Sequence, residues 1–83
     1  MSPKMIPKKL GEKLRDIRKF KGLSLDGMAE ALGKEKSSRR ARVFEWENGI
    51  RQPDYITLLK YAKFVDISTD MLIDDTLDLE LPS

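Results

Sequence analysis

The sequence contains no cysteine and no histidine, and only 7% of its residues are aromatic. The lack of cysteine excludes a disulfide framework and thiolate metal sites. The lack of histidine excludes imidazole ligands, histidine-based acid–base catalysis and a Ser-His-Asp triad. We therefore expect no catalytic residue, no metal and no cofactor, and we interpret the chain as a protein other than an enzyme.

Long apolar runs are also absent, since no uninterrupted run exceeds three residues. A membrane-spanning helix needs about 20 predominantly apolar residues. The first ten residues carry lysines and prolines with no apolar stretch after them, unlike a signal peptide. We expect a cytoplasmic protein with no membrane partner, and 83 residues leave room for one domain with a small core.

Acidic residues are scarce in the first half of the chain and basic residues in the second. Residues 1–42 hold 13 Lys/Arg against 5 Asp/Glu, whereas residues 43–83 hold 3 against 9. Clustered lysine and arginine release condensed counterions from nucleic acid, so the first half favours a polyanionic partner. A solvated basic face explains the same totals, and charge alone leaves both interpretations open.

The N-terminal part of the chain shows helical periodicity. Leu10, Leu14 and Ile17 recur at helical spacing, with charged residues such as Lys13 on the other faces. Gly22 is suited to close this helix, because glycine adopts the left-handed conformation that follows a helix end. A helix near residues 10–21 is therefore predicted.

A second helix is predicted to begin after Ser24, a good N-cap, and to end at Gly33. Gly27 lies within it and costs roughly 1 kcal/mol relative to alanine. We interpret Gly27 as allowing close approach of a neighbouring helix. The polar segment that follows Gly33 reads as a loop, in which Ser37 or Ser38 is available to cap the next helix.

A third helix is predicted over residues 39–48. Several arginines lie at its start, and Gly49 ends it. Asp54 caps a fourth helix. Its expected core positions recur at helical spacing, and they are Tyr55, Leu58, Leu59 and Ala62. Ser68 caps a short fifth helix that contains Met71 and Leu72.

The last ten residues alternate acids and leucines. Such a tail either adds an edge strand to a partner or stays disordered, and we favour disorder. The predicted organisation is an N-terminal arm (1–9), an all-α domain (10–74) and an acidic C-terminal tail (75–83). Residues 1–7 and about 75–83 are expected to lie outside the packed body.

Several short motifs together resemble the phage-repressor/Cro helix-turn-helix family, also called the Xre family. The resemblance covers roughly residues 10–73. The matching elements are Ile17-Arg18, Gly22-Leu23-Ser24, Met28-Ala29, Leu32-Gly33, Trp46-Glu47-Asn48-Gly49, Pro53, Leu58-Leu59, Ala62 and Ile67-Ser68.

The resemblance implies a compact five-helix, lambda-repressor-like domain in which helices 2 and 3 form the helix-turn-helix and helix 3 enters the major groove of double-stranded DNA. The residues agree, because arginine can donate two hydrogen bonds to guanine O6 and N7. Glu45 either accepts from cytosine N4 or pairs with Arg42 three residues away. The predicted base contacts are Arg39, Arg40, Arg42 and Glu45.

Phosphate contacts are expected around the same helix. The resemblance implies them for the loop that follows helix 3. The two lysines in the loop before that helix are either further phosphate contacts or ordinary surface residues. The predicted phosphate contacts are Ser24, Lys34, Lys36, Ser38, Asn48, Arg51 and Gln52.

The sequence departs from the family pattern at the expected DNA surface. About four extra residues separate Gly33 from Trp46 and lengthen the turn or helix 3. Leu25 stands where the family commonly has a phosphate-binding glutamine. Phe44 stands where a small polar residue is usual, and we favour packing against the inserted loop over contact with a thymine methyl group.

Three further residues are interpreted as scaffold. Trp46 is expected in the core, at helical spacing from Val43. The resemblance implies a structural salt bridge between Arg18 and Glu47, rather than a catalytic pair.

The leading interpretation is a sequence-specific DNA-binding transcriptional regulator, a repressor that binds its operator as a homodimer through helix 5 and the tail. The alternative is an antitoxin or adaptor whose acidic C-terminal half binds a small basic protein. Phage repressor, restriction-modification controller and antitoxin are not separated by the sequence.

Overall fold

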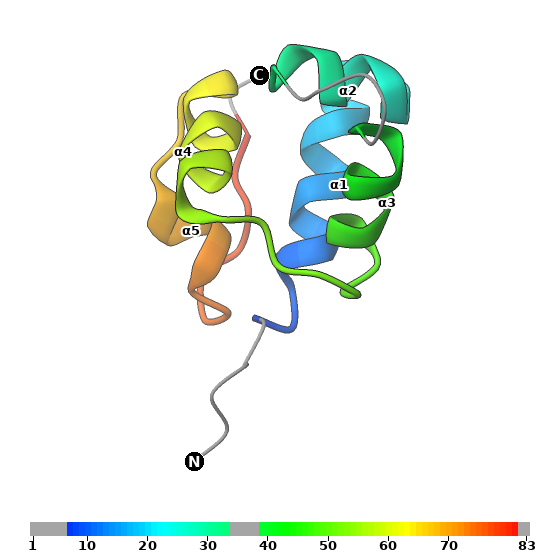
Figure 1. Cartoon of the computed structure of the whole chain (residues 1–83). Helices are drawn as coiled ribbons and strands as arrows, with labels where there is room; N and C mark the ends of the chain where they lie inside the picture. Colours follow the sequence, from blue (N-terminus) through cyan, green and yellow to red (C-terminus); the bar gives the residue numbers. More distant parts are fainter. Residues whose placement is uncertain (1–6, 34–38, 82–83) are drawn as a thin grey trace.

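The computed structural model describes residues 7–33 and 39–81, except for the side chain of Arg39. Within these ranges the chain forms five helices and no strand (Figure 1). The prediction of an all-α, five-helix domain with a helix-turn-helix at helices 2 and 3 is confirmed. The helices are α1 (Leu10–Phe20), α2 (Leu25–Ala31), α3 (Arg39–Glu47), α4 (Tyr55–Phe64) and α5 (Thr69–Ile73).

Predicted capping residues lie at the ends of the described helices, whereas the predicted cap of the third helix, Ser37 or Ser38, lies outside the described residues. Ser24 Oγ accepts a hydrogen bond from Gly27 N (3.0 Å), and Asp54 Oδ1 accepts one from Thr57 N (2.8 Å). Gly22, after α1, has a φ of 67°, as a left-handed helix end requires. Ser68 is the N-cap residue of α5, as predicted, but its side chain makes no capping hydrogen bond.

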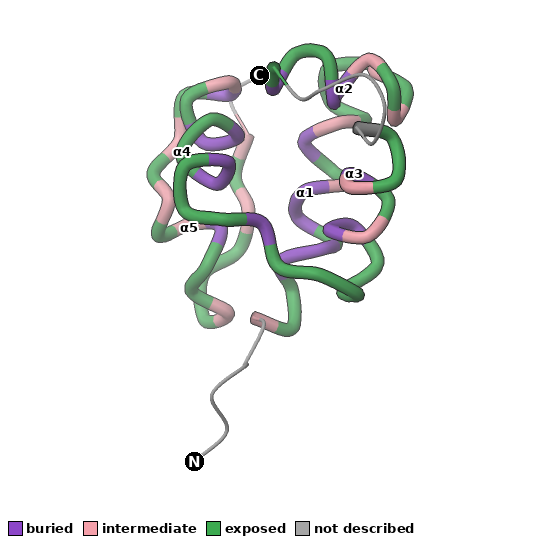
Figure 2. The backbone as a smooth tube through the Cα atoms, viewed as in Figure 1, coloured by how far each residue is buried: buried purple, intermediate pink, exposed green. Residues whose placement is uncertain are grey.

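The helices form two groups around a shared core. Helix α3 packs on α1 and α2, whereas α5 packs on α4 and α1 (Figure 1). The buried sides of α1 and α4 face the centre (Figure 2). Trp46 on α3 meets Tyr61 on α4 edge to face, with ring centroids 6.4 Å apart, and so joins the groups.

The core confirms most of the predicted apolar positions but corrects those on α4. Trp46 is buried, as expected. Tyr55 and Leu59 are 80% and 41% exposed, so two of the four expected core residues on α4 face solvent. The inward side of α4 instead carries Tyr61 beside Leu58 and Ala62, and Val65, directly after the helix, is buried as well. Helix α4 is thus rotated about its own axis relative to the orientation that its apolar spacing predicted.

Close approach between helices occurs at Gly11, and the interpretation of Gly27 was wrong. A Cβ atom on Gly11 would lie 2.5 Å from the carbonyl oxygen of Glu47, so α1 and the end of α3 meet through backbone atoms. A Cβ atom on Gly27 would meet Ser24 Oγ at 3.3 Å and the side chain of Leu23, both in the segment that leads into α2.

Lys13 is buried, although its charge predicted a solvent-facing position. Its side-chain ammonium donates hydrogen bonds to the carbonyl oxygens of Met71 (2.7 Å) and Asp74 (3.1 Å). The last carbonyl groups of a helix lack partners within the helix. Lys13 supplies these partners at the end of α5 and thereby ties α5 to α1.

Residues 74–81 form a segment that we call the C-terminal strap, and it contradicts the expected disordered tail. Leu79 and Leu81 are partly buried against the core. The Asp75 carboxylate accepts hydrogen bonds from the backbone N–H groups of Lys8 (2.8 Å) and Lys9 (3.0 Å). These bonds lower the pKa of Asp75. The strap is held because it satisfies free N–H groups ahead of α1 and covers apolar surface.

Candidate nucleic-acid interface

The helix-turn-helix pair is built from α2 and α3, which pack against each other. The hydroxyl of Ser24, a predicted phosphate contact, accepts the capping hydrogen bond from Gly27 N. Leu25, where the family commonly has a glutamine, packs partly buried against the core. The turn residues 34–38 lie outside the described part of the chain, and with them the predicted contacts Lys34, Lys36 and Ser38 and most of the insertion.

Helix α3 has one face in the core and one in solvent. Val43, Trp46 and Glu47 are buried. Positions four residues apart share a face of a helix. The exposed side chains described on the opposite side are Arg40, Ala41, Phe44 and Asn48.

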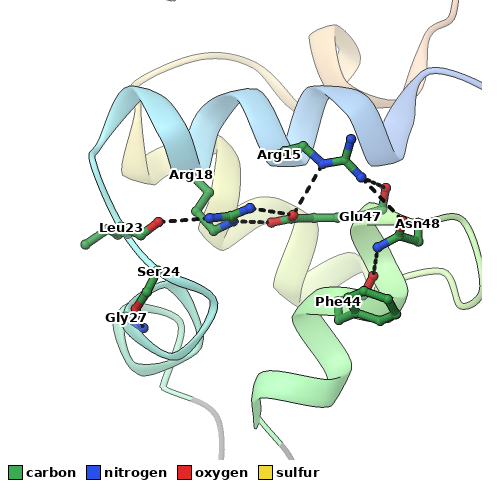
Figure 3. Close-up of polar contacts among 8 residues, drawn as sticks. All are labelled: Arg15, Arg18, Leu23, Ser24, Gly27, Phe44, Glu47 and Asn48. Carbon is green, nitrogen blue, oxygen red and sulfur yellow. Dashed lines mark hydrogen bonds and ion pairs between the residues drawn. The ribbon is translucent and has the colours of Figure 1, made fainter.

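Phe44 lies at the middle of this exposed face, and its predicted packing against the inserted loop falls on residues outside the described part of the chain. It is 49% exposed, because the core side of α3 is already filled by Val43 and Trp46. The carbonyl oxygen of Phe44 accepts a hydrogen bond from Asn48 Nδ2 at 2.8 Å, which ties the Asn48 side chain to the last turn of α3 (Figure 3).

The arginines at the start of α3 differ in their surroundings. Arg40 is largely exposed, and its guanidinium lies 3.9 Å from the carboxylate of Asp26 on α2. Arg42 is 41% exposed and sits toward the flank of the outer face. Arg39 begins α3, and its side chain lies outside the described part of the chain.

Glu45 joins two arginines from different elements, in an arrangement that we call the Glu45 cluster. Its Oε1 atom accepts hydrogen bonds from Arg51 Nε (3.0 Å) and from Arg42 Nη1 (3.2 Å). The bond from Arg51, and then that from Arg42, lowers the pKa of Glu45. The pair between Arg42 and Glu45 is therefore present, and Arg51 is an additional partner that the spacing within a helix could not reveal.

Arg51 and Gln52 are exposed in the loop between α3 and α4. With Asn48 at the end of α3, they place polar side chains beside the outer face of that helix. These three of the predicted phosphate contacts are thus brought together on one end of the helix-turn-helix.

A buried ion pair fixes α3 to α1. Arg18 Nε and Nη2 donate to the two carboxylate oxygens of Glu47 at 2.7 and 3.0 Å, and Nη1 donates to the carbonyl oxygen of Leu23 (3.0 Å) (Figure 3). The hydrogen bond to Glu47 raises the pKa of Arg18. The pair implied by the resemblance is present and aligns the end of α3 with the entry into α2.

Arg15 also belongs to this junction and was missed in the sequence. Its guanidinium lies 3.7 Å from Glu47 Oε1 and donates to the side-chain oxygen of Asn48 at 3.4 Å (Figure 3). The sequence spacing could have indicated its role, because Arg15 and Arg18 are three residues apart and share a face of α1.

Other kinds of site find little support in the described residues. They hold no group of three or more His, Cys, Asp or Glu placed to bind a metal ion. No helix among them is long and apolar enough to cross a membrane. The polar groups around α3 are arginine–carboxylate pairs and exposed amides.

A family model described as a helix-turn-helix domain matches residues 11–77. The chain therefore belongs to the helix-turn-helix family, and its arrangement is Xre-like. This family and fold are those of DNA-binding regulators and not of enzymes.

Two relatives are similar to the chain. An uncharacterized HTH-type transcriptional regulator of Bacillus subtilis (strain 168), YqaE, is 37% identical over 62 residues, which are 75% of this chain and 50% of YqaE. The chain thus spans about half the length of this relative. The crystal structure of the restriction-modification controller protein C.AhdI from Aeromonas hydrophila is 34% identical, with a TM-score of 0.63, and the match covers 77% of this chain and 91% of that one.

Proposed function

We propose that the chain is a sequence-specific, double-stranded DNA-binding transcriptional regulator, a repressor that binds its operator as a homodimer. The observation that carries this proposal is the two-sided character of α3. Its inner face is fixed by the core and by the ion pair between Glu47 and Arg18, while Arg40, Phe44 and Asn48 face solvent. A helix that is fixed on one side, and exposed on the other within the part of the chain that the structure describes, fits the major groove.

The proposed base contacts are Arg40 and Arg42, with Arg39 at the start of the helix. A guanidinium offers two parallel donors for the edge of guanine. Phe44, which is exposed on the same helix, is a proposed contact for a thymine methyl group, because apolar contact with that methyl is one way of reading a base pair. Glu45 is a candidate for accepting a hydrogen bond from cytosine.

The proposed phosphate contacts flank these residues. Asn48, Arg51 and Gln52 lie at the end of α3, and Ser24 lies at the start of α2. Contacts of this kind fix the register of the protein on the duplex without reading its sequence. Lys34, Lys36 and Ser38 complete the proposed set from the turn before α3.

The alternative of an antitoxin or adaptor with an acidic protein-binding half gains less support. Asp75 already accepts hydrogen bonds from two backbone N–H groups, and Asp78 lies 3.8 Å from the ammonium of Lys9. Part of the acidic charge is thus engaged within the chain.

A salt titration of DNA binding tests the proposal. The chain is titrated into a labelled duplex of random sequence and, separately, into duplexes enriched by the chain itself. Each neutralised phosphate contributes about −0.9 to the slope of log K against log salt, so four or more contacts give a slope steeper than about −3. A flat salt dependence, or the absence of any enriched sequence, would refute the proposal.

A further inference from the structure

We propose that Glu45 is a positioning residue for DNA recognition. Its carboxylate holds Arg42 of α3 beside Arg51 of the following loop, and this arrangement increases the preference of the chain for its own site over other DNA. The inference rests on the proposed function, since it requires that α3 reads DNA.

Glu45 joins α3 to the following loop through both its side chain and its backbone. Through its side chain, Oε1 accepts from Arg51 Nε at 3.0 Å and from Arg42 Nη1 at 3.2 Å. Through its backbone, the carbonyl oxygen accepts from Ile50 N at 2.9 Å and Arg51 N at 3.3 Å. The Glu45 side chain is only 26% exposed, whereas Arg42 and Arg51 are 41% and 54% exposed. The carboxylate is therefore the inner member, and the guanidiniums form the outer surface.

The charges of this cluster explain why one carboxylate affects both arginines. Two guanidiniums that share one oxygen would repel each other if the carboxylate were neutral. Each would then be free to turn toward the nearest anion, which on DNA is a phosphate of any sequence. With the carboxylate in place, Arg42 is ordered before binding, and less conformational entropy is lost when its planar fork meets a base edge.

The same carboxylate lowers the affinity for DNA in general. It places a fixed negative charge beside a surface that approaches phosphates. Specificity is a difference between two affinities, so a group that weakens all complexes and orders a base-reading side chain widens that difference. The role of a direct cytosine contact is less favoured, because Oε1 already accepts from two donors.

The experiment compares the full chain with its Glu45→Gln variant. A duplex library of random sequence is enriched with the unmodified chain, and the selected duplex and the unselected library are then titrated at several salt concentrations. We expect Glu45→Gln to bind the unselected library at least about threefold more tightly. Its salt slope should steepen by about 0.9 to 1.8, as one or two arginines reach phosphates. The ratio of the two affinities should fall about tenfold or more. Glu30→Gln, which removes an exposed carboxylate from α2, is the matched control and should leave this ratio unchanged.

A double-mutant cycle with Arg42→Ala tests whether Glu45 acts through Arg42. If it does, Glu45→Gln changes the affinity ratio much less in the Arg42→Ala chain than in the unmodified chain. Equal effects in both chains, or an unchanged ratio after Glu45→Gln, would overturn the inference. Loss of preference at a single cytosine with selectivity elsewhere intact would also overturn it, since Glu45 would then read a base. An unmodified chain that enriches no sequence would refute the proposed function as well.

Discussion

At the scale of single residues, surroundings decide what each arginine does. Arg18 is mostly buried and uses its guanidinium on Glu47 and the carbonyl oxygen of Leu23. Arg42 is held by one carboxylate at the flank of α3, and Arg40 is 71% exposed, with a long contact to Asp26. Arg40 is therefore the described arginine of α3 with the greatest freedom to meet a base.

Arg40→Ala is expected to weaken binding to the preferred duplex by about 1–3 kcal/mol and to flatten the preference at one position of the site. The reason is the loss of a two-donor contact in the groove. Lys63→Ala, which removes one positive charge from the exposed side of α4, is the control. Fluorescence anisotropy with the selected duplex and its single-position variants measures both effects. An unchanged preference after Arg40→Ala would exclude Arg40 as a base contact.

Removal of Glu47 alone is expected to destabilise the fold by about 3–5 kcal/mol, because it leaves the guanidinium of Arg18 without its charge partner in a largely buried position. The double variant Arg18→Met with Glu47→Met should recover much of this loss, since neither charge then remains buried. Urea denaturation followed by circular dichroism measures the free energy of unfolding. A single variant as stable as the unmodified chain would contradict a structural role for the pair.

At the scale of elements, the position of α3 depends on contacts that its own sequence does not contain. The end of α3 rests on the backbone of α1 at Gly11, and Arg18 and Arg15 of α1 reach the same place. The strap holds the N-terminal end of α1, next to Gly11, through the carboxylate of Asp75. Contacts with α1 thus hold α3, the proposed DNA-reading helix, in position.

Gly11→Ala is expected to destabilise the domain by about 1–3 kcal/mol, as overpacking does. Alanine favours a helix over glycine, but here its Cβ would lie 2.5 Å from the carbonyl oxygen of Glu47, and α1 and α3 would have to separate. Gly27→Ala, where the nearest atom is a side-chain hydroxyl at 3.3 Å, should change stability by no more than about 1 kcal/mol. Thermal unfolding compares the two variants, and equal stabilities would argue against the close contact.

The strap predicts a pH dependence. Hydrogen bonds from Lys9 N and Lys8 N lower the pKa of Asp75 below its usual 3.8 in the folded chain. A lowered folded-state pKa contributes stability that is present above the unfolded pKa and is lost as the pH falls through the folded pKa. Asp75→Asn should therefore be less stable than the unmodified chain at pH 7, and the difference should shrink below about pH 3.8. Urea denaturation from pH 7 to pH 2.5 checks this, and a difference independent of pH would contradict it.

At the scale of the whole molecule, the basic and acidic halves of the chain do not remain apart. The strap returns acidic residues to the start of α1, where Asp75 meets the backbone of Lys8 and Lys9. Ile73 on α5 and Leu77 in the strap are 43% and 40% exposed. We propose that two copies associate through α5 and the strap, to which these two side chains belong. The two copies would bind half-sites about 34 Å apart on DNA.

Ile73→Asp is expected to dissociate the proposed homodimer, because it places a charge in an apolar contact. Sedimentation equilibrium should give twice the chain mass of 9.6 kDa for the unmodified protein and a single chain for the variant. Tyr55→Asp on α4 is the control, since Tyr55 is 80% exposed on a different helix. Dissociation by Tyr55→Asp alone would place the interface on α4, and a monomeric unmodified protein at saturating DNA would refute the dimer.

The sequence by itself determined the helices, most of their caps and the family, because helical periodicity, N-caps and left-handed glycines depend on neighbouring residues. The predictions that lie outside the described residues, such as those for Lys34 and Lys36, stay predictions. Tertiary structure decided which face of α4 is buried, that Lys13 lies inside and that the strap returns to α1. It also brought Arg51 to Glu45 and left Phe44 in solvent. These outcomes depend on partners distant in the chain or on how a helix is rotated in the core, and local patterns do not fix either.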